Sequence, residues 1–346
     1  TGIFSSRSDR SAAAAREFGI AEDRIYHDVE SMLDAERERP DGAEVIAIMT
    51  PNDSHFEYAS AAVERQFHVI CDKPLTNTLS EARKLREAVE RTGVVFCLTH
   101  NYTGYPMVRQ ARALIETGVL GDIRLVQVEY VQGGKAEPTE KRADAPLSWK
   151  FDPARRGPSA VMGDIGTHAH NLLRYVTALE IASLSATLGA IVPGREFHDY
   201  GGALLQMSNG ARGVFWVTQA AAGMDNSLKI RVSGENGTIE WFQEIPQELV
   251  YRPREAPSQR FIANGPGVLP FAKRASRIVK AHPEGFPEAF ANIYSDAAEA
   301  IAARISGTEV DPAATTFPTV TDGVKGLEFI AAAIESSDNG GRWVDL

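Results

Sequence analysis

Apolar residues in the first hundred positions alternate between short continuous runs and longer stretches with helical spacing. The runs are rich in β-branched residues, and they lie at positions 44–49, 68–71 and 94–99. Such runs are typical of strands that are buried on both faces. Between them, residues 56–65 and 80–92 have the spacing of amphipathic helices. This alternation predicts an α/β domain with a parallel sheet over residues 1–100.

The pattern changes after a predicted helix at 106–117. From residue 123 the apolar positions alternate with polar ones, and short polar turns separate the runs, as at Asn236-Gly237 between 228–232 and 238–242. Asn-Gly between alternating runs is a strong hairpin signal. We therefore predict a second α+β domain over residues 101–346 with a large, mostly antiparallel sheet. Its late helices, at 287–304 and 319–336, close the chain, and the last one either stays with this domain or packs back on the first.

Composition narrows the functional classes. The chain has 346 residues, of which 43% are hydrophobic and 24% charged, and its formal net charge is -10. This charge argues against a nucleic-acid partner, and no apolar run is long enough to cross a bilayer. Cys71 and Cys97 are the two cysteines, and both fall in predicted buried strands. They predict reduced thiols and a cytoplasmic protein, although residues upstream of Thr1 leave a signal peptide open.

The run that ends at Cys71 is followed by Asp72-Lys73-Pro74. Lys73 is therefore expected at the carboxyl end of a parallel strand, where open α/β sheets bind their ligands. A partly desolvated lysine exchanges protons near neutral pH, and Pro74 restricts Lys73 to extended geometry and admits a cis bond. A surface lysine at the start of a loop fits this short motif equally well.

A second motif, Asp164-Ile165-Gly166-Thr167-His168, leads into a stretch with helical spacing. If that helix begins near Gly163, Asp164 and His168 lie one turn apart on the same face. With Lys73 they form a candidate acid/base set.

With these motifs the chain resembles the Gfo/Idh/MocA oxidoreductases. Asp72-Lys73-Pro74 corresponds to the family's Glu-Lys-Pro motif, and the segment from Asp164 to His168 corresponds to its Asp-x-Gly-x-His motif. The chain departs from the family at Asp72, which replaces the commoner glutamate, and at Asn171, which replaces a second aspartate. Two further matches are the turn formed by Thr50-Pro51-Asn52 and His55, and Asn101 after a later strand.

The resemblance implies a Rossmann-type first domain and an NAD- or NADP-dependent dehydrogenase. Its reaction would be hydride transfer between a nicotinamide and a secondary alcohol of a sugar or cyclic polyol. His168 is the expected proton acceptor, Lys73 the donor to the reacting oxygen and Asp164 the orienting group, but Lys73 and His168 could exchange roles. The expected cofactor contacts are Ser6, Arg7, Thr50, Pro51, Asn52, His55, Asp72, Lys73 and Asn101.

Two details extend this hypothesis. The segment Ser5-Ser6-Arg7 offers no acid before Asp9, which slightly favours NADP over NAD. The charged, proline-broken segment 133–162 is long enough to be functional, and we expect Trp149, Lys150 and Arg156 to line the substrate site. His282 is a weaker candidate. Surface or structural roles remain open for all four.

The sequence lacks the G-x-G-x-x-G turn with which a dinucleotide fold opens. We expect that one strand, one helix and part of a further strand, roughly 30 residues, precede Thr1. In that case the chain as given would not hold a dinucleotide tightly.

Three other expectations concern metal, mechanism and assembly. His168 and His170 are two residues apart, so on a helix they point about 200° apart and no metal site is expected. A metal-dependent lyase or hydrolase would need a strand there, and a non-catalytic nucleotide sensor would not need Lys73, Asp164 and His168. Phe215, Val217 and Trp241 mark an apolar face of the second sheet, and the resemblance implies a homodimer or homotetramer through that sheet.

Overall fold

The computed structural model describes residues 2–5, 7–138, 140, 149–152 and 155–346. The first domain contains two parallel sheets, β1-β2 and β3-β4-β5, with helices α1 to α4 between their strands. The bounds are β1 (Ile3–Phe4), α1 (Ser8–Phe18), β2 (Ile25–Tyr26), α2 (Val29–Glu38), β3 (Val45–Ile48), α3 (His55–Glu64), β4 (His68–Cys71), α4 (Leu79–Thr92) and β5 (Phe96–Leu98). The predicted α/β class and parallel pairing are confirmed.

Strand β4 has a continuous apolar sequence because both of its faces are covered. Val69 and Cys71 belong to the main hydrophobic core. Ile70 instead packs in a second cluster with residues of α8 (Phe286–Ser306), among them Ile293 and Ala297. The buried strand thus ends at Cys71, and Asp72 and Lys73 follow it at the edge of the sheet.

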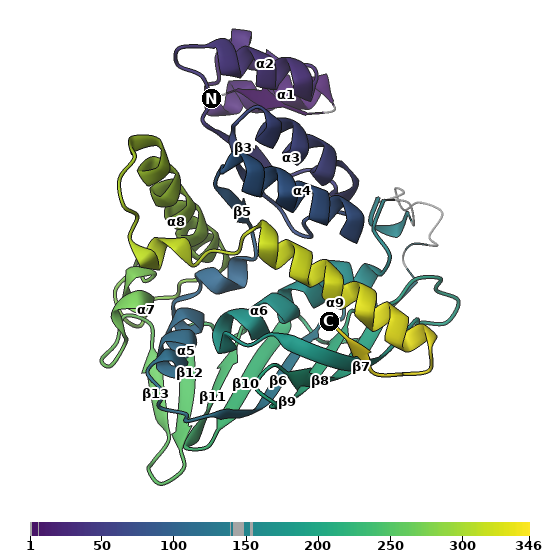
Figure 1. Ribbon diagram of the computed structural model, residues 1–346, viewed down its shortest axis with the longest axis vertical. Coiled ribbons are helices and arrows are strands. Elements are labelled where there is room, and N and C mark those ends of the chain that lie inside the picture. Colours follow the sequence, from purple (N-terminus) through teal and green to yellow (C-terminus); the bar gives the residue numbers. More distant parts are fainter. Residues whose placement is uncertain (1, 6, 139, 141–148, 153–154) are drawn as a thin grey trace.

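The second domain is built on a nine-stranded sheet (Figure 1). Its strand order is β13-β12-β11-β10-β6-β9-β8-β7-β14, and β6 and β9 pair in parallel while the other neighbours pair antiparallel. The bounds are β6 (Ile123–Val131), β7 (Ile181–Gly189), β8 (Tyr200–Met207), β9 (Arg212–Thr218), β10 (Ser227–Gly234), β11 (Gly237–Phe242), β12 (Glu248–Pro253), β13 (Gln259–Ile262) and β14 (Val344–Asp345).

Helices α5 (Pro106–Glu116), α6 (Thr167–Thr177) and α9 (Val320–Asp338) lie over one face of this sheet (Figure 1). Phe215, Val217 and Trp241 point to that covered face and are at most 1% exposed. Phe215 packs edge-on against Phe329 of α9, and Trp241 lies against Tyr105 at the start of α5. Our expectation that these three residues mark a partner-facing surface is therefore wrong, because helices of the same chain cover them.

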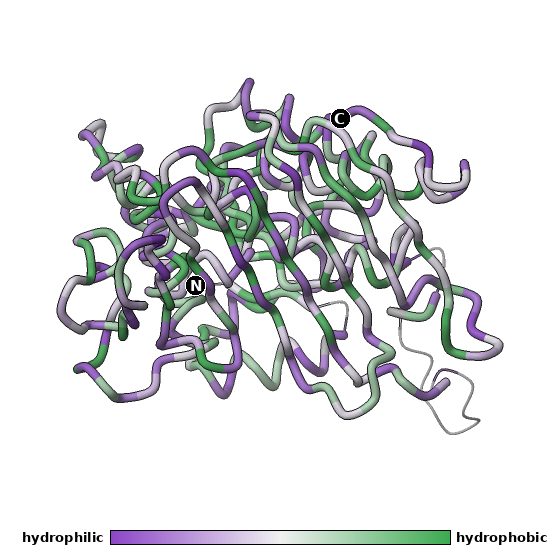
Figure 2. Tube along the Cα trace, turned by 90° about the horizontal axis from the view of Figure 1, so that it is seen from below, coloured by the Kyte–Doolittle hydropathy of each residue, from purple (hydrophilic) through white to green (hydrophobic). Residues whose placement is uncertain are grey.

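The opposite face of the sheet carries exposed apolar side chains. In the view from below, hydrophobic positions are interleaved with hydrophilic ones along the trace of the strands (Figure 2). Leu125, Leu204 and Val214 are 57%, 55% and 46% exposed, and Trp216 is 37% exposed. Leu204 and Val214 are directly paired across β8 and β9. The exposed apolar side chains of this sheet's central strands are thus on this second face.

Helix α9 lies between the two domains and contacts both α4 and β7 (Figure 1). Arg83 of α4 forms an ion pair with Glu328 of α9 at 3.1 Å. On the other side, Ser336 accepts a 2.8 Å hydrogen bond from the amide of Ala186 in β7. Helix α4 itself begins at Leu79, one residue before the predicted range of 80–92, because Thr78 caps it through a capping box with Glu81.

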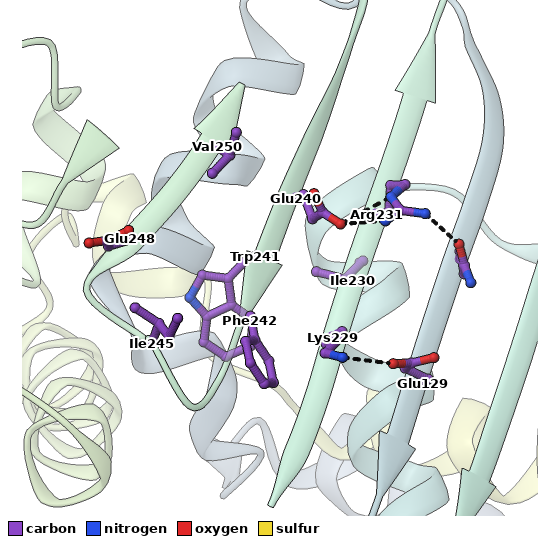
Figure 3. A pocket seen from close by; sticks show the side chains of 11 residues that line it. Glu129, Lys229, Ile230, Arg231, Glu240, Trp241, Phe242, Ile245, Glu248 and Val250 are labelled. Carbon is purple, nitrogen blue, oxygen red and sulfur yellow. Dashed lines mark hydrogen bonds and ion pairs between the residues drawn. The ribbon is translucent and has the colours of Figure 1, made fainter. Parts of the chain in front are cut away.

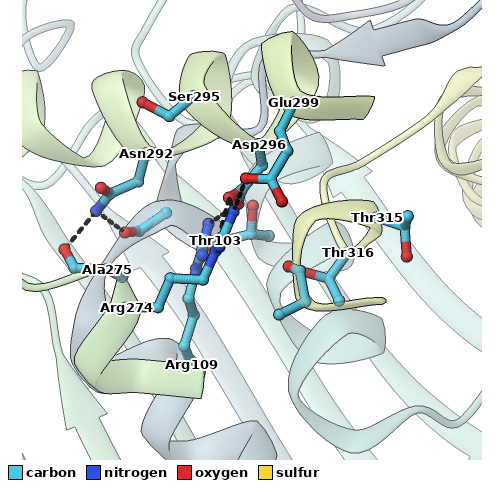
Figure 4. A network of polar contacts seen from close by, with 12 residues as sticks. Thr103, Arg109, Arg274, Ala275, Asn292, Ser295, Asp296, Glu299, Thr315 and Thr316 are labelled. Atoms are coloured by element: carbon cyan, nitrogen blue, oxygen red, sulfur yellow. Dashed lines mark hydrogen bonds and ion pairs between the residues drawn. The ribbon is translucent and has the colours of Figure 1, made fainter. Parts of the chain in front are cut away.

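A buried ion pair joins α5 to α8 beside α7 (Pro270–Arg274) (Figure 4). Arg109 and Asp296 meet at 2.6 Å with side chains 2% and 3% exposed. Arg274 approaches the other oxygen of Asp296 at 3.2 Å, and Asn292 donates to the carbonyl oxygens of Gly104 and Ala275.

Across the described ranges, the chain has no helix with both the length and the apolar character that a membrane span requires.

Candidate active site

The carboxyl ends of β3, β4 and β5 place polar residues along one edge of the first domain. Thr50 and Asn52 follow β3, Lys73 follows β4, and Asn101 follows β5. This edge is the usual ligand position of an open α/β sheet. A cavity of about 170 Å³ opens there, lined by Thr50, Asn52, Asp72, Lys73, Pro74, Lys135, Trp149, Arg156, Ala160 and Asp164.

Lys73 joins this edge to the second domain. Its Nζ atom donates to the backbone carbonyl oxygen of Asp164 and lies 3.4 Å from Oδ1 of the same residue. The peptide bond between Lys73 and Pro74 is cis. Asp72 accepts a 2.7 Å hydrogen bond from the hydroxyl of Thr99, the residue after β5, and this contact fixes the carboxylate next to Lys73. Lys73 therefore points toward Asp164, with its side chain 19% exposed.

We expected Asp164 and His168 to lie one α-helical turn apart on the same face. The structure does not show this arrangement. Residues Met162–Gly166 form a π-helical turn, closed by a hydrogen bond from Thr167 to Met162, and α6 begins after it at Thr167. A π turn inserts one extra residue, so the two side chains point in different directions. Asp164 faces the two lysines of the pocket, whereas His168 enters an aromatic cluster.

The imidazole of His168 is buried among other rings. Its centroid lies 5.0 Å from that of Tyr102, 5.4 Å from that of His100 and 6.4 Å from that of Tyr130. Burial, with the nearby charge of Lys73 second, holds the pKa of His168 well below its ordinary value. The same two causes lower the pKa of His100 to about 3. Both imidazoles are therefore neutral at physiological pH.

His55 positions the pocket from behind. It is fully buried, and its Nδ1 and Nε2 atoms lie 2.8 Å and 2.9 Å from the carbonyl oxygens of Pro74 and Thr50. Both ring nitrogens thus contact protein backbone. His55 ties the turn after β3 to the turn after β4, and in this geometry neither nitrogen is presented to a cofactor.

Three residues of the site escaped the sequence analysis: Lys135, Gln219 and Gln132. Lys135 lies 3.3 Å from Oδ2 of Asp164, and Gln219 donates to the same oxygen at 2.9 Å. Gln132 accepts from Gln219 at 3.1 Å. Gln132 and Lys135 follow β6 and Gln219 follows β9, and these strands are parallel, so their carboxyl ends meet. The signal was the position just after a strand, but the pairing of β6 with β9 was not visible in the sequence.

The expected substrate residues separate into two groups. Trp149 and Arg156 line the pocket, and Arg156 donates to the carbonyl oxygen of Phe151 at 2.9 Å and lies over the ring of Phe197. Arg155, its neighbour, forms a 2.6 Å ion pair with Asp53 of the first domain. His282 is exposed and lies outside the lining of this pocket. The side chain of Lys150 is outside the described part of the chain.

At the other expected cofactor region, Arg7 forms an exposed ion pair with Asp9 at 2.6 Å. Ser6 lies outside the described residues.

Near the pocket, Nδ2 of Asn101 is buried and makes no hydrogen bond to any described group. A buried amide donor of this kind, at the carboxyl end of β5, fits a polar cofactor group at this edge. The part of the chain that the structure describes contains no cluster of three or more metal-ligating side chains.

Comparisons with known proteins agree with this geometry. Residues 1–100 match the model of an oxidoreductase family with an NAD-binding Rossmann fold, and residues 108–240 match the GFO/IDH/MocA C-terminal domain. The chain is 32% identical to the uncharacterized oxidoreductase YfiI of Bacillus subtilis, over all of this chain and 88% of that protein. It is 31% identical to levoglucosan dehydrogenase of Pseudarthrobacter phenanthrenivorans, over 71% of this chain and 66% of that protein.

Among solved structures, an inositol dehydrogenase homolog from Azotobacter vinelandii, complexed with NADH and myo-inositol, is similar along the whole chain. It is 33% identical with a TM-score of 0.90, and the alignment covers 100% of this chain and 89% of that one.

Proposed function

The chain belongs to the Gfo/Idh/MocA family of NAD-binding oxidoreductases, and on this basis we propose that it oxidises a secondary alcohol of a sugar or cyclic polyol. The observation that carries the proposal is the contact of Lys73 with Asp164 next to the buried His168. Lys73 and Asp164 supply a cation and a carboxylate to the cavity. The neutral imidazole of His168 is not part of the cavity lining, but it lies close enough for the charge of Lys73 to lower its pKa. The levoglucosan dehydrogenase and the inositol-bound homolog, both with cyclic polyhydroxyl ligands in their names, support the substrate class.

The protein's own groups would manage the proton of the substrate hydroxyl. The neutral imidazole of His168 can accept this proton, whereas the ammonium of Lys73 stabilises negative charge on the oxygen. Asp164 holds Lys73 in place through its carbonyl and carboxylate oxygens. The reverse assignment, with Lys73 as the acceptor, uses the same geometry. When bound, the nicotinamide supplies the hydride acceptor.

The cofactor would be NAD or NADP, with its nicotinamide end at the edge of β3, β4 and β5. Thr50, Asn52, Asp72 and Asn101 are the side chains placed to hold it there. His55 contributes indirectly, since it fixes the turns that carry Thr50 and Pro74.

We also propose that the exposed face of the nine-stranded sheet forms a homodimer or homotetramer interface. Leu125, Leu204, Val214 and Trp216 provide the apolar surface. The charged side chains beside them are largely paired within the chain, as Lys229 is with Glu129 and Arg231 is with Glu240 (Figure 3). A face that combines exposed apolar residues with neutralised charges is suited to burial against a second copy.

The assay that tests the proposed activity follows nicotinamide absorbance at 340 nm, which is a property of the reduced cofactor. Full-length protein is supplied with NAD or NADP and a panel of myo-inositol, D-glucose, D-xylose and levoglucosan. We expect cofactor reduction with at least one cyclic polyol or sugar, and chelator treatment should not change the rate. Activity on none of a broad set of such alcohols, or activity that disappears with chelator, would contradict the proposal.

A further inference from the structure

The carboxylate of Asp164 lies between two lysines. Oδ1 is 3.4 Å from Nζ of Lys73, and Oδ2 is 3.3 Å from Nζ of Lys135. Lys135 also donates to Oε1 of Gln219 at 2.7 Å, and Gln219 donates to Asp164. All three charged groups line the same cavity. The side chains of Lys73 and Lys135 are only 19% and 15% exposed, so water screens them weakly.

The backbone of Lys135 is fixed by a buried ion pair whose two residues are not themselves part of the cavity lining. Arg195 and Asp199 meet at 2.9 Å, and both side chains are 0% exposed. Arg195 donates to the carbonyl oxygen of Lys135 at 2.6 Å. The carbonyl oxygen of Asp199 accepts from the amide of Gln219 at 3.1 Å. One buried pair thus sets the positions of both groups that hold Oδ2 of Asp164.

Lys135 and Gln219 are also joined directly, since the amide of Lys135 donates to the carbonyl oxygen of Gln219 at 2.9 Å. Arg195 extends the same network to the following segment through the carbonyl oxygen of Glu137 and the carboxylate of Glu140. A surface lysine needs no such support. A lysine that must present its ammonium group at a fixed point of a binding site does need it.

We propose that Lys135 is a specificity-determining residue that binds the substrate hydroxyl next to the one that is oxidised. This inference rests on the proposed function. Lys73 serves the reacting hydroxyl, and Asp164 is shared, so each of its oxygens lies beside one ammonium donor. Two donor and acceptor pairs side by side match two hydroxyl groups on neighbouring carbons. The substrate class is therefore a vicinal diol, and Arg195 is a positioning residue for its second hydroxyl.

The test compares each substrate with the derivative that lacks one hydroxyl beside the reacting carbon. The probes are myo-inositol, D-glucose, D-xylose and levoglucosan with their monodeoxy derivatives, and the variants are Lys135→Met and Lys135→Arg. A hydrogen bond to a charged group is worth about 1.5–3 kcal/mol, so Lys135→Met should raise KM for the parent roughly 10- to 100-fold. It should raise KM for the matching deoxy derivative by less than about 3-fold, because that contact is already absent. Lys135→Arg should restore part of the discrimination.

Equal KM increases for the parent and for every deoxy derivative would overturn the role of Lys135, as would no increase at all. If wild-type protein oxidises none of the parents, the proposed function fails instead, and the two failures are thus distinguishable. If Lys135→Met does not fold, Gln219→Leu provides the same comparison, because it removes the other partner of the Lys135 ammonium.

Arg195→Lys tests the positioning role, with Arg109→Lys as a matched control. Both arginines are buried and ion-paired, so both variants should lower the melting temperature. Only Arg195→Lys should reduce the KM ratio between the deoxy derivative and the parent, with kcat changing much less than KM. A reduced ratio in both variants, or in neither, would show that Arg195 is merely structural.

Discussion

The Nζ atom of Lys73 donates a hydrogen bond to the main-chain carbonyl oxygen of Asp164, a residue 91 positions later in the chain. Lys73 follows β4, the central strand of the three-stranded sheet, and Asp164 lies in the π turn before α6. Because the acceptor is main chain, this contact does not require any particular side chain at position 164. It brings two segments from different domains together at one cavity, and the carboxylate of Asp164 adds a second contact to the same ammonium group.

We predict that Lys73→Ala and His168→Ala each lower kcat by roughly 10²–10⁴, the range for loss of a positioned acid/base group. Cofactor affinity should change little in His168→Ala, because the proposed role of this residue concerns the substrate proton. Steady-state kinetics and cofactor titration of full-length protein measure both effects. Lys84→Ala, at an exposed position of α4, is the control and should retain wild-type turnover. Ordinary turnover in His168→Ala would remove it from the site.

The position of polar residues after a buried strand could be predicted from the sequence, because a buried apolar run ends where polar residues begin. This principle identified Lys73 at the edge of the first sheet, whereas Thr50, Asn52 and Asn101 were expected there from the family resemblance. It could not identify Lys135 and Gln219, since their meeting depends on the parallel pairing of β6 with β9 across about 80 residues of chain.

Three other details depended on tertiary context. The π turn at Met162–Gly166 breaks the regular 3.6-residue spacing from which we placed Asp164 and His168 on one face. Periodicity showed that the second sheet has an apolar face at Phe215 and Trp241, but it could not show whether helices of the same chain or a partner subunit cover it. The motif Thr50-Pro51-Asn52 with His55 lies at the carboxyl end of β3, but the sequence could not show that both ring nitrogens of His55 contact backbone carbonyl oxygens.

Stability should fall as the pH decreases from about 6.5 toward 5. Burial lowers the pKa of His100 to about 3 and those of His168 and His170 well below the ordinary value. In the unfolded chain these groups have a pKa near 6.5, so below this pH the unfolded state binds more protons than the folded one. Their contribution is complete above about pH 6.5 and is lost progressively as the pH falls toward the folded pKa values.

Each buried histidine contributes a slope of up to about 1.4 kcal/mol per pH unit in this window. Urea unfolding at several pH values measures it. His170→Phe should reduce the slope by up to one such contribution, since His170 is buried against Phe329 and would no longer titrate. His282→Gln, at an exposed position, is the matched control and should leave the slope unchanged. A stability that is constant between pH 6.5 and 5 would contradict the burial of all three imidazoles.

Breaking the ion pair between Arg109 and Asp296 should be strongly destabilising. Both side chains are almost fully buried, and Arg109→Met leaves the carboxylate of Asp296 with the contacts of Arg274 at 3.2 Å and 3.4 Å, both to its other oxygen (Figure 4). Removal of one partner of a buried pair costs about 3–5 kcal/mol. The double variant Arg109→Met/Asp296→Leu should recover part of this loss, since no uncompensated charge remains. Denaturant unfolding measures both, and Arg254→Met, in an exposed pair with Glu255, should cost less than about 1 kcal/mol.

Charged substitutions on the open face of the large sheet should separate the subunits. Leu204 and Val214 are paired neighbours at 55% and 46% exposure, so Leu204→Glu with Val214→Lys places charges at the centre of the proposed interface. Analytical ultracentrifugation should show a smaller species than wild type at the same concentration, with an unchanged circular dichroism spectrum. Phe18→Glu, which changes a 71% exposed apolar residue on α1, should keep the wild-type mass. An unchanged mass in the double variant would place the contact elsewhere.

The cofactor preference should respond to the ion pair between Arg7 and Asp9. Arg7 follows the strand position at which dinucleotide folds contact the ribose, and an arginine there suits the 2′-phosphate of NADP. In the structure its Nη2 atom lies 2.6 Å from Asp9, and both side chains are exposed. Asp9 therefore competes with a phosphate for the same guanidinium. We expect Asp9→Asn to raise the ratio of kcat/KM for NADP over NAD, and Arg7→Ala to lower this ratio, in full-length protein.

The control for a general electrostatic effect is Arg10→Ala. Arg10 lies in α1, about one helical turn after Arg7, and this variant also removes a positive charge. If Arg7→Ala and Arg10→Ala change the ratio equally, Arg7 does not recognise the 2′-phosphate, and the small preference for NADP that its position suggests has no basis.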